Sequence, residues 1–110
     1  MTSVEGIENK QSTMKKGWVY IVENPAWPNV VKIGAALHLK KRLGSYQTSD
    51  PYRAFRYVKI WKTDNREEHE AALHRELVDL LLNGEWFRDD MARIEGVIEG
   101  IILFDLIDHQ

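Results

Sequence analysis

Apolar and polar residues alternate along several stretches of the chain in a way that predicts β-strands. Residues 17–24 (GWVYIVEN) and 30–34 (VVKIG) are rich in aromatic and β-branched residues, which favour strands. The proline-rich segment between them must be a loop, and its shortness predicts an antiparallel hairpin. Residues 54–62 (AFRYVKIWK) alternate strictly, which predicts a third strand with Tyr57 and Trp61 on the same face.

Other segments carry apolar residues at helical spacing. Residues 37–47 place Leu39, Leu43 and Tyr46 on one stripe, which predicts a short helix. Residues 63–84 begin with acidic residues and end at a glycine, as a long helix would.

The C-terminal part of the chain predicts one more helix. Residues 85–87 (EWF) form a short extended piece, and residues 89–107 have a helical apolar period. The buried stripe of this last helix is expected at Ile94, Val97, Ile98 and Ile101.

The predicted order of elements is β-β-α-β-α-α. An α+β fold follows, with a three-stranded antiparallel sheet flanked by helices. Residues 1–16 are polar and lack periodicity, so we expect a flexible N-terminal leader. Residues 17–110 are then expected to form a single domain, in keeping with a length of 110 residues.

Composition narrows the class of protein. The chain has no cysteine, which excludes disulfides, thiolate metal sites and cysteine nucleophiles. It shows no secretory signal and no apolar run long enough to span a membrane, so a cytoplasmic protein is expected. The formal net charge of -2 argues against a protein that coats nucleic acid, but a local basic patch is compatible with it.

The long helix has a stripe that changes character along its length. Glu67, Glu70 and His74 share a face with Leu77 and Leu81. Such a stripe is typical of a helix that runs from a cleft into the core. Alternatively, its first turns protrude into solvent, where the helix dipole favours acidic side chains.

Three further polar side chains interrupt apolar patterns. Tyr20 and Lys32 lie within strands, and Arg42 follows Gly34 by eight residues on the predicted short helix. Each has an ordinary interpretation: a packed tyrosine, a solvated lysine, a basic helix face.

Taken together, these motifs resemble the GIY-YIG nuclease superfamily. The chain has VYIV at 19–22, VKIG at 31–34, EAALH at 70–74 and GEWF at 84–87. Their order is similar to a phage and bacterial branch of that superfamily with VYIL-, VKIG-, ExxLH- and EWF-like motifs. The resemblance covers roughly residues 17–88.

The resemblance implies a set of site residues. Tyr20 matches the tyrosine of the first motif, Gly34 the glycine of the second, Arg42 the helix arginine, and Glu70 the metal-binding glutamate. Lys32 stands where the superfamily name has its second tyrosine.

The remaining family positions match less closely. The family's histidine has no clear counterpart, and His38 and His74 are candidate substitutes. Glu85 lies near the position of a late asparagine in many members. The catalytic set implied by the resemblance is Tyr20, Lys32, Arg42, Glu70, His74 and Glu85. The substrate contacts expected beside it are Gly34, His38, Lys41 and Trp27.

The resemblance also implies an activity. A metal-dependent endonuclease would hydrolyse DNA phosphodiester bonds with one Mg²⁺ or Mn²⁺ ion held by Glu70. Arg42 would contact the phosphate. Tyr20 would orient or deprotonate the attacking water, which requires a pKa lowered from about 10. The alternative is a catalytically inactive nucleic-acid-binding or protein-interaction module.

Partners other than DNA follow less directly. A protein partner could supply specificity, because no second domain is visible in the sequence. Gly96 and Gly100 on the last helix permit close helix approach, so we expect a monomer or a weak homodimer.

Overall fold

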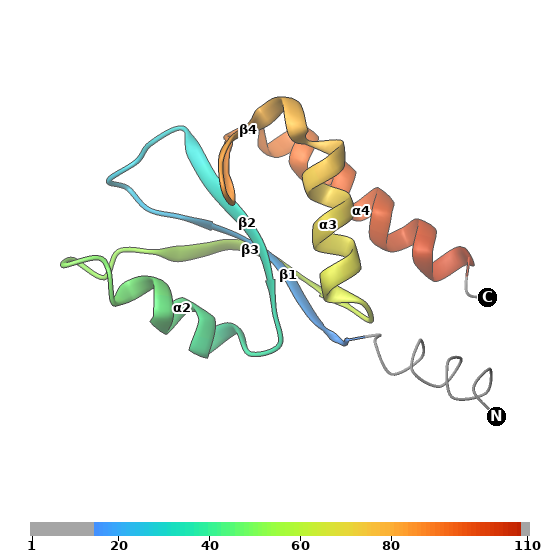
Figure 1. The fold of residues 1–110 in the computed structure, drawn as a ribbon, viewed down its shortest axis with the longest axis horizontal. Helices are drawn as coiled ribbons and strands as arrows, with labels where there is room; N and C mark the ends of the chain where they lie inside the picture. The colour runs from blue at the N-terminus through green and yellow to red at the C-terminus, as the bar shows by residue number, and fades with distance from the viewer. Residues whose placement is uncertain (1–14, 109–110) are drawn as a thin grey trace, which may run out of the picture.

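The computed structural model describes residues 15–108, which form one antiparallel sheet with helices on both faces (Figure 1). The sheet has five strands in the order β3-β1-β2-β5-β4. The strands are β1 (Gly17–Glu23), β2 (Val30–Ala36), β3 (Arg56–Thr63), β4 (Leu81–Asn83) and β5 (Trp86–Arg88). The helices of the described residues are α2 (Leu39–Gln47), α3 (Arg66–Glu76) and α4 (Met91–Asp108), with a 3₁₀ turn at Val78–Leu80.

The helices lie in two layers. α2 covers one face of the sheet, and α3 and α4 cover the other (Figure 1). Alternate residues of β1 enter the two cores: Val19 and Ile21 pack beneath α3 and α4, whereas Tyr20 and Val22 pack beneath α2. The stripe predicted for α4 is confirmed, since Ile94 and Ile98 are fully buried there and Val97 and Ile101 pack partly against the same core.

The predicted three-stranded sheet is wrong. The three predicted strands are present, but β5 adds to the free edge of β2, and β4 pairs with β5. Each added strand has only three residues, which is too short to show a period of two. The pairing of Val31 with Phe87 also joins segments far apart in the chain, which no local pattern reports.

The predicted long helix also ends early. α3 stops at Glu76, and the segment after the 3₁₀ turn becomes β4. Leu81, predicted on the helix stripe, is therefore an exposed strand residue. Gly84 lies in the β4–β5 turn with φ at 57°. Pairing with β5 overrides the local helical pattern, as tertiary contacts commonly do.

A β-bulge breaks the alternation predicted for the third strand. Ile21 pairs with Lys59 and Val22 with Tyr57, so one extra residue of β3 lies between these pairs. Tyr57 therefore packs beneath α2, while Trp61 packs on the α3 side. The prediction that they share a face is wrong for this reason.

Most of the predicted leader lies outside the described residues. At Lys15, the first described residue, the carbonyl oxygen accepts a hydrogen bond from the backbone N–H of Arg66 at 2.8 Å. Within residues 15–108 the structure has no helix long and apolar enough to cross a membrane.

Candidate active site

The β1–β2 hairpin places Tyr20 directly opposite Gly34. The Tyr20 ring passes over Gly34 so closely that a Cβ on that glycine would lie 2.5 Å from Tyr20 Oη. The Tyr20 side chain is completely buried, with 0% of its surface exposed. Gly34 therefore leaves room for the Tyr20 side chain. The glycine itself lies beneath the Tyr20 ring.

Helix α2 brings Arg42 to the Tyr20 hydroxyl. The helix begins three residues after β2 ends, so its first turns lie close to the end of that strand. Arg42 Nη1 donates to Tyr20 Oη and to the carbonyl oxygen of Ala35, each at 3.1 Å. Both bonds use one nitrogen of a guanidinium that has five N–H donors. The side chain is thus held in place with donors left to point elsewhere.

Tyr46 is the site residue that the sequence analysis missed. The helical spacing places Tyr46 on the apolar stripe of the short helix, and its ring does pack in that core. Its hydroxyl, however, lies 2.5 Å from Tyr20 Oη and donates to Glu85 Oε1 at 3.2 Å. A position on an apolar helix stripe predicts that the tyrosine ring is buried. It does not predict which residues the tyrosine hydroxyl contacts.

Strand β5 positions Glu85. The backbone N–H of Ile33 donates to the carbonyl oxygen of Glu85 at 3.0 Å, which fixes this residue beside β2. The Glu85 side chain thereby reaches the Tyr46 hydroxyl. The strand absent from the predicted sheet is therefore the element that brings this carboxylate to the site.

Helix α3 supplies Glu70 from the opposite side. His74, one turn later, lies 3.9 Å from Glu70 Oε2 through its Nε2 atom. The same Nε2 lies 3.2 Å from the carbonyl oxygen of Ile33. A carbonyl only accepts, so Nε2 carries the proton in that hydrogen bond. His74 thus ties α3 to β2 behind Glu70.

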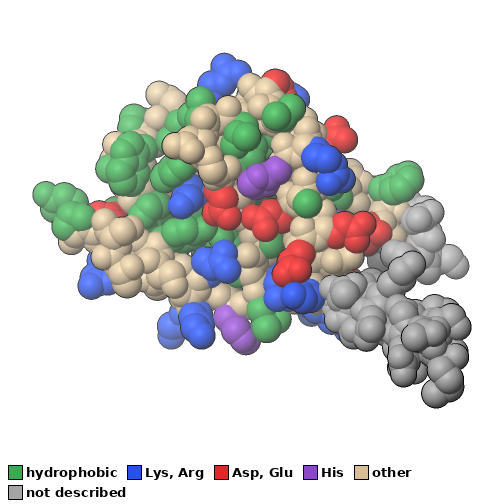
Figure 2. Space-filling view, viewed as in Figure 1, with side chains coloured by type: hydrophobic (Ala, Val, Ile, Leu, Met, Phe, Trp, Pro, Cys, Tyr) green, Lys and Arg blue, Asp and Glu red, His purple; other side chains and the backbone are tan. Residues whose placement is uncertain are grey.

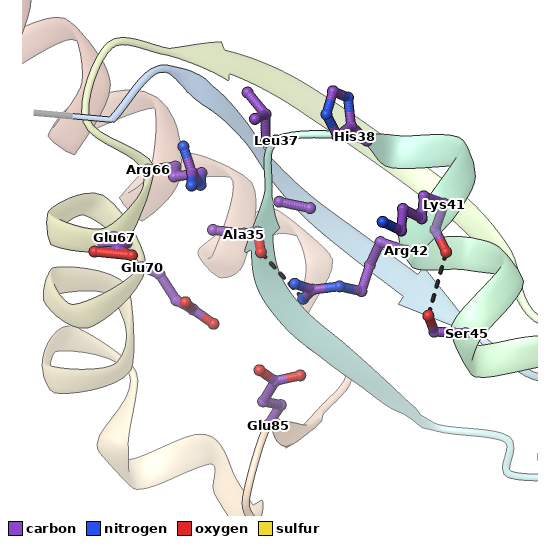
Figure 3. Close-up of a pocket in the computed structure, with 11 residues that line it drawn as sticks. Ala35, Leu37, His38, Lys41, Arg42, Ser45, Arg66, Glu67, Glu70 and Glu85 are labelled. Atoms are coloured by element: carbon purple, nitrogen blue, oxygen red, sulfur yellow. Dashed lines mark hydrogen bonds between the residues drawn. The ribbon is translucent and has the colours of Figure 1, made fainter.

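These elements enclose a pocket of about 580 Å³ between α2 and α3. Because it is the candidate active site, we call it the catalytic pocket. Its lining residues are Ala35, Ala36, Leu37, His38, Lys41, Arg42, Ser45, Arg66, Glu67, Glu70 and Glu85. In Figure 3 the Glu70 and Glu85 side chains extend into the space between the α3 helix and the Arg42 guanidinium. Figure 2 shows acidic side chains gathered at the centre of this face, with Lys and Arg on both sides. The α2 side of the pocket is therefore a basic wall, whereas the α3 side carries Glu67 and Glu70 together with Arg66.

The electrostatics of the pocket favour a bound cation. Burial, together with the neighbouring Glu85 carboxylate, raises the pKa of Glu70 to about 7, although Arg42 acts in the opposite direction. The raised pKa means that the ionised form of Glu70 is disfavoured by its burial and by the negative charge beside it. A cation beside Glu70 would relieve this repulsion.

The pKa of Tyr20 is raised, whereas a general base would need a lowered pKa. Burial raises the Tyr20 pKa above its ordinary value, and this outweighs the lowering by the hydrogen bonds to Tyr46 and Arg42. The lowered pKa that the sequence analysis required is not found. Tyr20 is therefore a protonated, buried hydroxyl that orients Arg42 and Tyr46.

His38 and Lys41 lie at the basic side of the catalytic pocket. His38 precedes α2 and makes no side-chain capping hydrogen bond. Both residues are exposed and line the pocket, and their contact with a substrate stays a prediction.

Lys32 and Trp27 lie in a neighbouring cavity. Lys32 Nζ lies 4.5 Å from the centre of the Tyr46 ring and 5.1 Å from that of Trp86. Lys32 and Trp27 line a second cavity with Tyr46, Phe55 and Trp86, which we call the aromatic groove. The structure thus groups Arg42, Glu70 and Glu85 in one pocket and places Lys32 and Trp27 in another.

The carboxylates suit a magnesium ion. Within residues 15–108 no cluster of three or more His, Asp or Glu side chains could hold a metal. Mg²⁺ needs no such cluster, because it keeps several waters and is commonly bound by one or two carboxylates plus substrate phosphates. Glu70 provides such a carboxylate, and Glu85 lies near it.

Comparison with known proteins assigns the chain to a family. The sequence model of the T5orf172 domain matches residues 17–102, most of the chain. The protein belongs to the T5orf172 domain family. No curated protein and no solved structure gives a significant match.

The T5orf172 domain is a phage-associated domain of endonuclease type. Its matched residues include all five strands, α2, α3 and most of α4. Membership in the T5orf172 family is consistent with a nuclease-like or DNA-binding module.

Proposed function

We propose that this T5orf172 protein is a metal-dependent endonuclease of GIY-YIG type that hydrolyses DNA phosphodiester bonds. One observation carries the proposal: Arg42 and Glu70 line the same pocket from opposite sides. They come from helices far apart in the chain, and they occupy positions that match the arginine and the metal-binding glutamate of that superfamily.

Glu70 would hold the cation. Its raised pKa and the Glu85 carboxylate nearby support a site with spare negative charge. When bound, a Mg²⁺ or Mn²⁺ ion supplies Lewis-acid polarisation of the phosphate and stabilises the leaving oxygen.

Arg42 binds the scissile phosphate. Its guanidinium is anchored through Nη1 to Tyr20 and Ala35, so its orientation is set before substrate arrives. The planar fork of an arginine matches two phosphate oxygens better than a lysine does. Lys41 and His38, at the same side of the pocket, would contact the neighbouring backbone of the DNA.

Glu85 accepts the proton of the attacking water. It faces the pocket as a carboxylate and is oriented by the Tyr46 hydroxyl. The His74 Nε2 proton is directed at the Ile33 carbonyl, and Tyr20 is buried, so neither is as well placed for this transfer. Tyr20 and Tyr46 are positioning residues in this scheme.

The test is nicking of supercoiled plasmid DNA with Mg²⁺ or Mn²⁺. We expect the wild-type protein to nick the plasmid and EDTA to stop it. Glu70→Gln keeps the shape of the side chain and should abolish the activity. Glu76→Gln is the matched control, because Glu76 lies on the same helix outside the catalytic pocket.

Two results would overturn the proposal. Equal nicking by wild type and Glu70→Gln would identify a contaminating nuclease. Absence of cleavage of plasmid, single-stranded DNA and RNA with either ion would exclude the endonuclease.

A second function is DNA binding without cleavage. The observation that favours it is the basic wall of the pocket, which Arg42 and Lys41 line. In that case the basic wall of the pocket binds a DNA phosphate. Arg42→Ala would then weaken DNA binding, and Mg²⁺ would have no effect on plasmid integrity.

A further inference from the structure

The aromatic groove lies next to the catalytic pocket but takes no part in the chemistry proposed above. It has a volume of about 520 Å³, within the range of small-molecule pockets. The rings of Trp27 and Trp86 meet edge to face with centroids 5.6 Å apart. Phe55 lies beside both, at 6.2 Å from Trp27 and 6.5 Å from Trp86. These rings form a wall of aromatic faces.

The groove also holds a cation. Lys32 is half-buried, and its ammonium lies over the Tyr46 and Trp86 rings. The aromatic faces attract this charge, but they do not neutralise it. A ligand that combines a flat aromatic group with a negative charge would match both features, and a nucleotide has this chemistry.

Tyr46 joins the groove to the catalytic pocket. Its ring lines the groove, whereas its hydroxyl donates to Glu85, which lines the pocket. Tyr46 therefore contacts a residue that lines the neighbouring pocket. A DNA strand with one phosphate at Arg42 could place a nearby nucleotide against the groove.

The loop that carries Trp27 is held in position. Asn24 Nδ2 donates to Asp50 Oδ2 at 2.7 Å, and Asp50 in turn accepts the backbone N–H of Ala54 at 2.8 Å. The Trp27 backbone N–H donates to the Asn24 carbonyl at 3.0 Å. Trp27 is nevertheless 50% exposed, so it is anchored at its backbone and open at its ring.

We propose that the aromatic groove binds an unpaired nucleobase of the DNA substrate. The base stacks on the half-exposed ring of Trp27, and its phosphate contacts Lys32. Bases inside a duplex already stack on each other, so the groove favours single-stranded or gapped DNA over intact duplex. This inference rests on the proposed function for the identity of the polymer.

The test compares two labelled single strands in EDTA, where no cleavage occurs. One is an oligodeoxythymidine, and the other has the same length and charge but only abasic sites. Wild-type protein should bind the base-bearing strand at least about 10-fold more tightly, since stacking on aromatic side chains has that order of effect. Trp27→Ala should bring the ratio close to one without weakening the abasic strand. Trp27→Phe should restore most of the wild-type ratio of affinities.

Tyr52→Ala is the matched control. Tyr52 is an aromatic residue with 87% of its surface exposed, and it lies outside the groove. We expect this variant to keep the wild-type ratio. Near-UV circular dichroism would show that each variant keeps its fold.

The possible failures can be told apart. A wild-type ratio near one would overturn the stacking site and favour an apolar protein side chain as the occupant. A ratio unchanged in folded Trp27→Ala would overturn it too. Binding of neither strand removes the DNA premise, and the proposed function fails with it. Base-dependent binding without Mg²⁺-dependent nicking would uphold the groove and reject the hydrolysis.

Discussion

Tyr20 and Gly34 face each other across the β1–β2 pairing, and the tyrosine ring occupies the space where a Gly34 side chain would lie. A Cβ at Gly34 would come within 2.7 Å of Tyr20 Cζ as well as closer to Oη. The ring cannot move away freely, because its hydroxyl bonds to Tyr46 and Arg42. Because Gly34 has no side chain, the Tyr20 ring fits at this position, and its buried hydroxyl can bond to Arg42 and Tyr46.

Gly34→Ala should destabilise the protein by about 1–3 kcal/mol, the usual cost of overpacking a core. It should also reduce nicking, because a displaced Tyr20 no longer orients Arg42. Urea denaturation measures the first effect. Gly44→Ala is the control: a Cβ at Gly44, in α2, meets nothing within 4 Å. That change should stabilise the helix by about 0.5–1 kcal/mol. Equal midpoints for the two variants would contradict the close packing.

Glu70 should make stability fall as pH rises. Its folded pKa of about 7 lies above the value of about 4.3 expected in the unfolded chain, so the folded state binds more protons between these values. The loss of folding stability caused by Glu70 grows through this pH range and is complete above pH ~7. In EDTA, Glu70→Gln should therefore raise the free energy of unfolding at pH ~8 by up to about 3 kcal/mol and change it little at pH ~4.

Urea denaturation of wild type, Glu70→Gln and Glu76→Gln at both pH values measures this effect. Glu76, which is exposed, should give no such pH-dependent gain. A Glu70→Gln protein that is less stable than wild type at the higher pH would contradict the raised pKa.

Binding of Mg²⁺ should offset the destabilisation that ionised Glu70 causes at high pH. A cation that binds only the folded state stabilises it by about 2.7 kcal/mol at a concentration of 100 times its Kd. We expect the melting temperature of wild type to rise with Mg²⁺ at pH ~8, and that of Glu70→Gln to stay constant. Glu85→Gln should keep the Mg²⁺ effect and lose nicking, since Glu85 is assigned to the water. KCl at matched ionic strength controls for screening, and a rise of equal size in Glu70→Gln would place the ion elsewhere.

Arg42→Lys should retain charge but lose function. A lysine cannot bond Tyr20 and Ala35 while it also presents a planar fork to a phosphate. We expect nicking to fall by about 10²-fold, in the range for loss of one donor to transition-state charge. Lys40→Arg, on the same helix but outside the pocket lining, is a suitable control. Wild-type kinetics in Arg42→Lys would rule out a fork contact.

His69 should matter for stability and not for the catalytic pocket. This buried histidine, which the sequence analysis did not single out, bonds Thr63 Oγ1 through Nδ1 and lies 3.1 Å from Asp105 Oδ2 through Nε2. It thereby links β3, α3 and α4. His69→Ala should cost about 1–3 kcal/mol, whereas His38→Ala should cost little, because His38 is exposed. Measured urea midpoints that do not differ would contradict this role, and the Mg²⁺ effect should survive in the His69 variant.

The sequence predicts the parts of the fold whose signals are local. The β1–β2 hairpin, α2, the start of α3 and the buried stripe of α4 all follow from alternation, prolines and helical spacing. Residues 85–87 are also predicted to be extended, which agrees with β5. The pairing of β5 with β2 and of β4 with β5 does not follow from the sequence, because three-residue strands have no measurable period and β2 is far away in the chain. The β-bulge in β3 is likewise invisible, since it arises from the register against β1.

The sequence by itself determined which side chains are candidates for a phosphate site, because its motifs resemble a known superfamily and that resemblance selects residues such as Arg42, Glu70 and Glu85. Only the tertiary structure decided where they meet, because a non-local strand carries Glu85 to β2 and a missing Cβ at Gly34 admits the Tyr20 ring. It also decided that Lys32 faces aromatic rings in the neighbouring groove. Pairing across a sheet and close packing depend on distances between remote segments, and no pattern along one segment contains those distances.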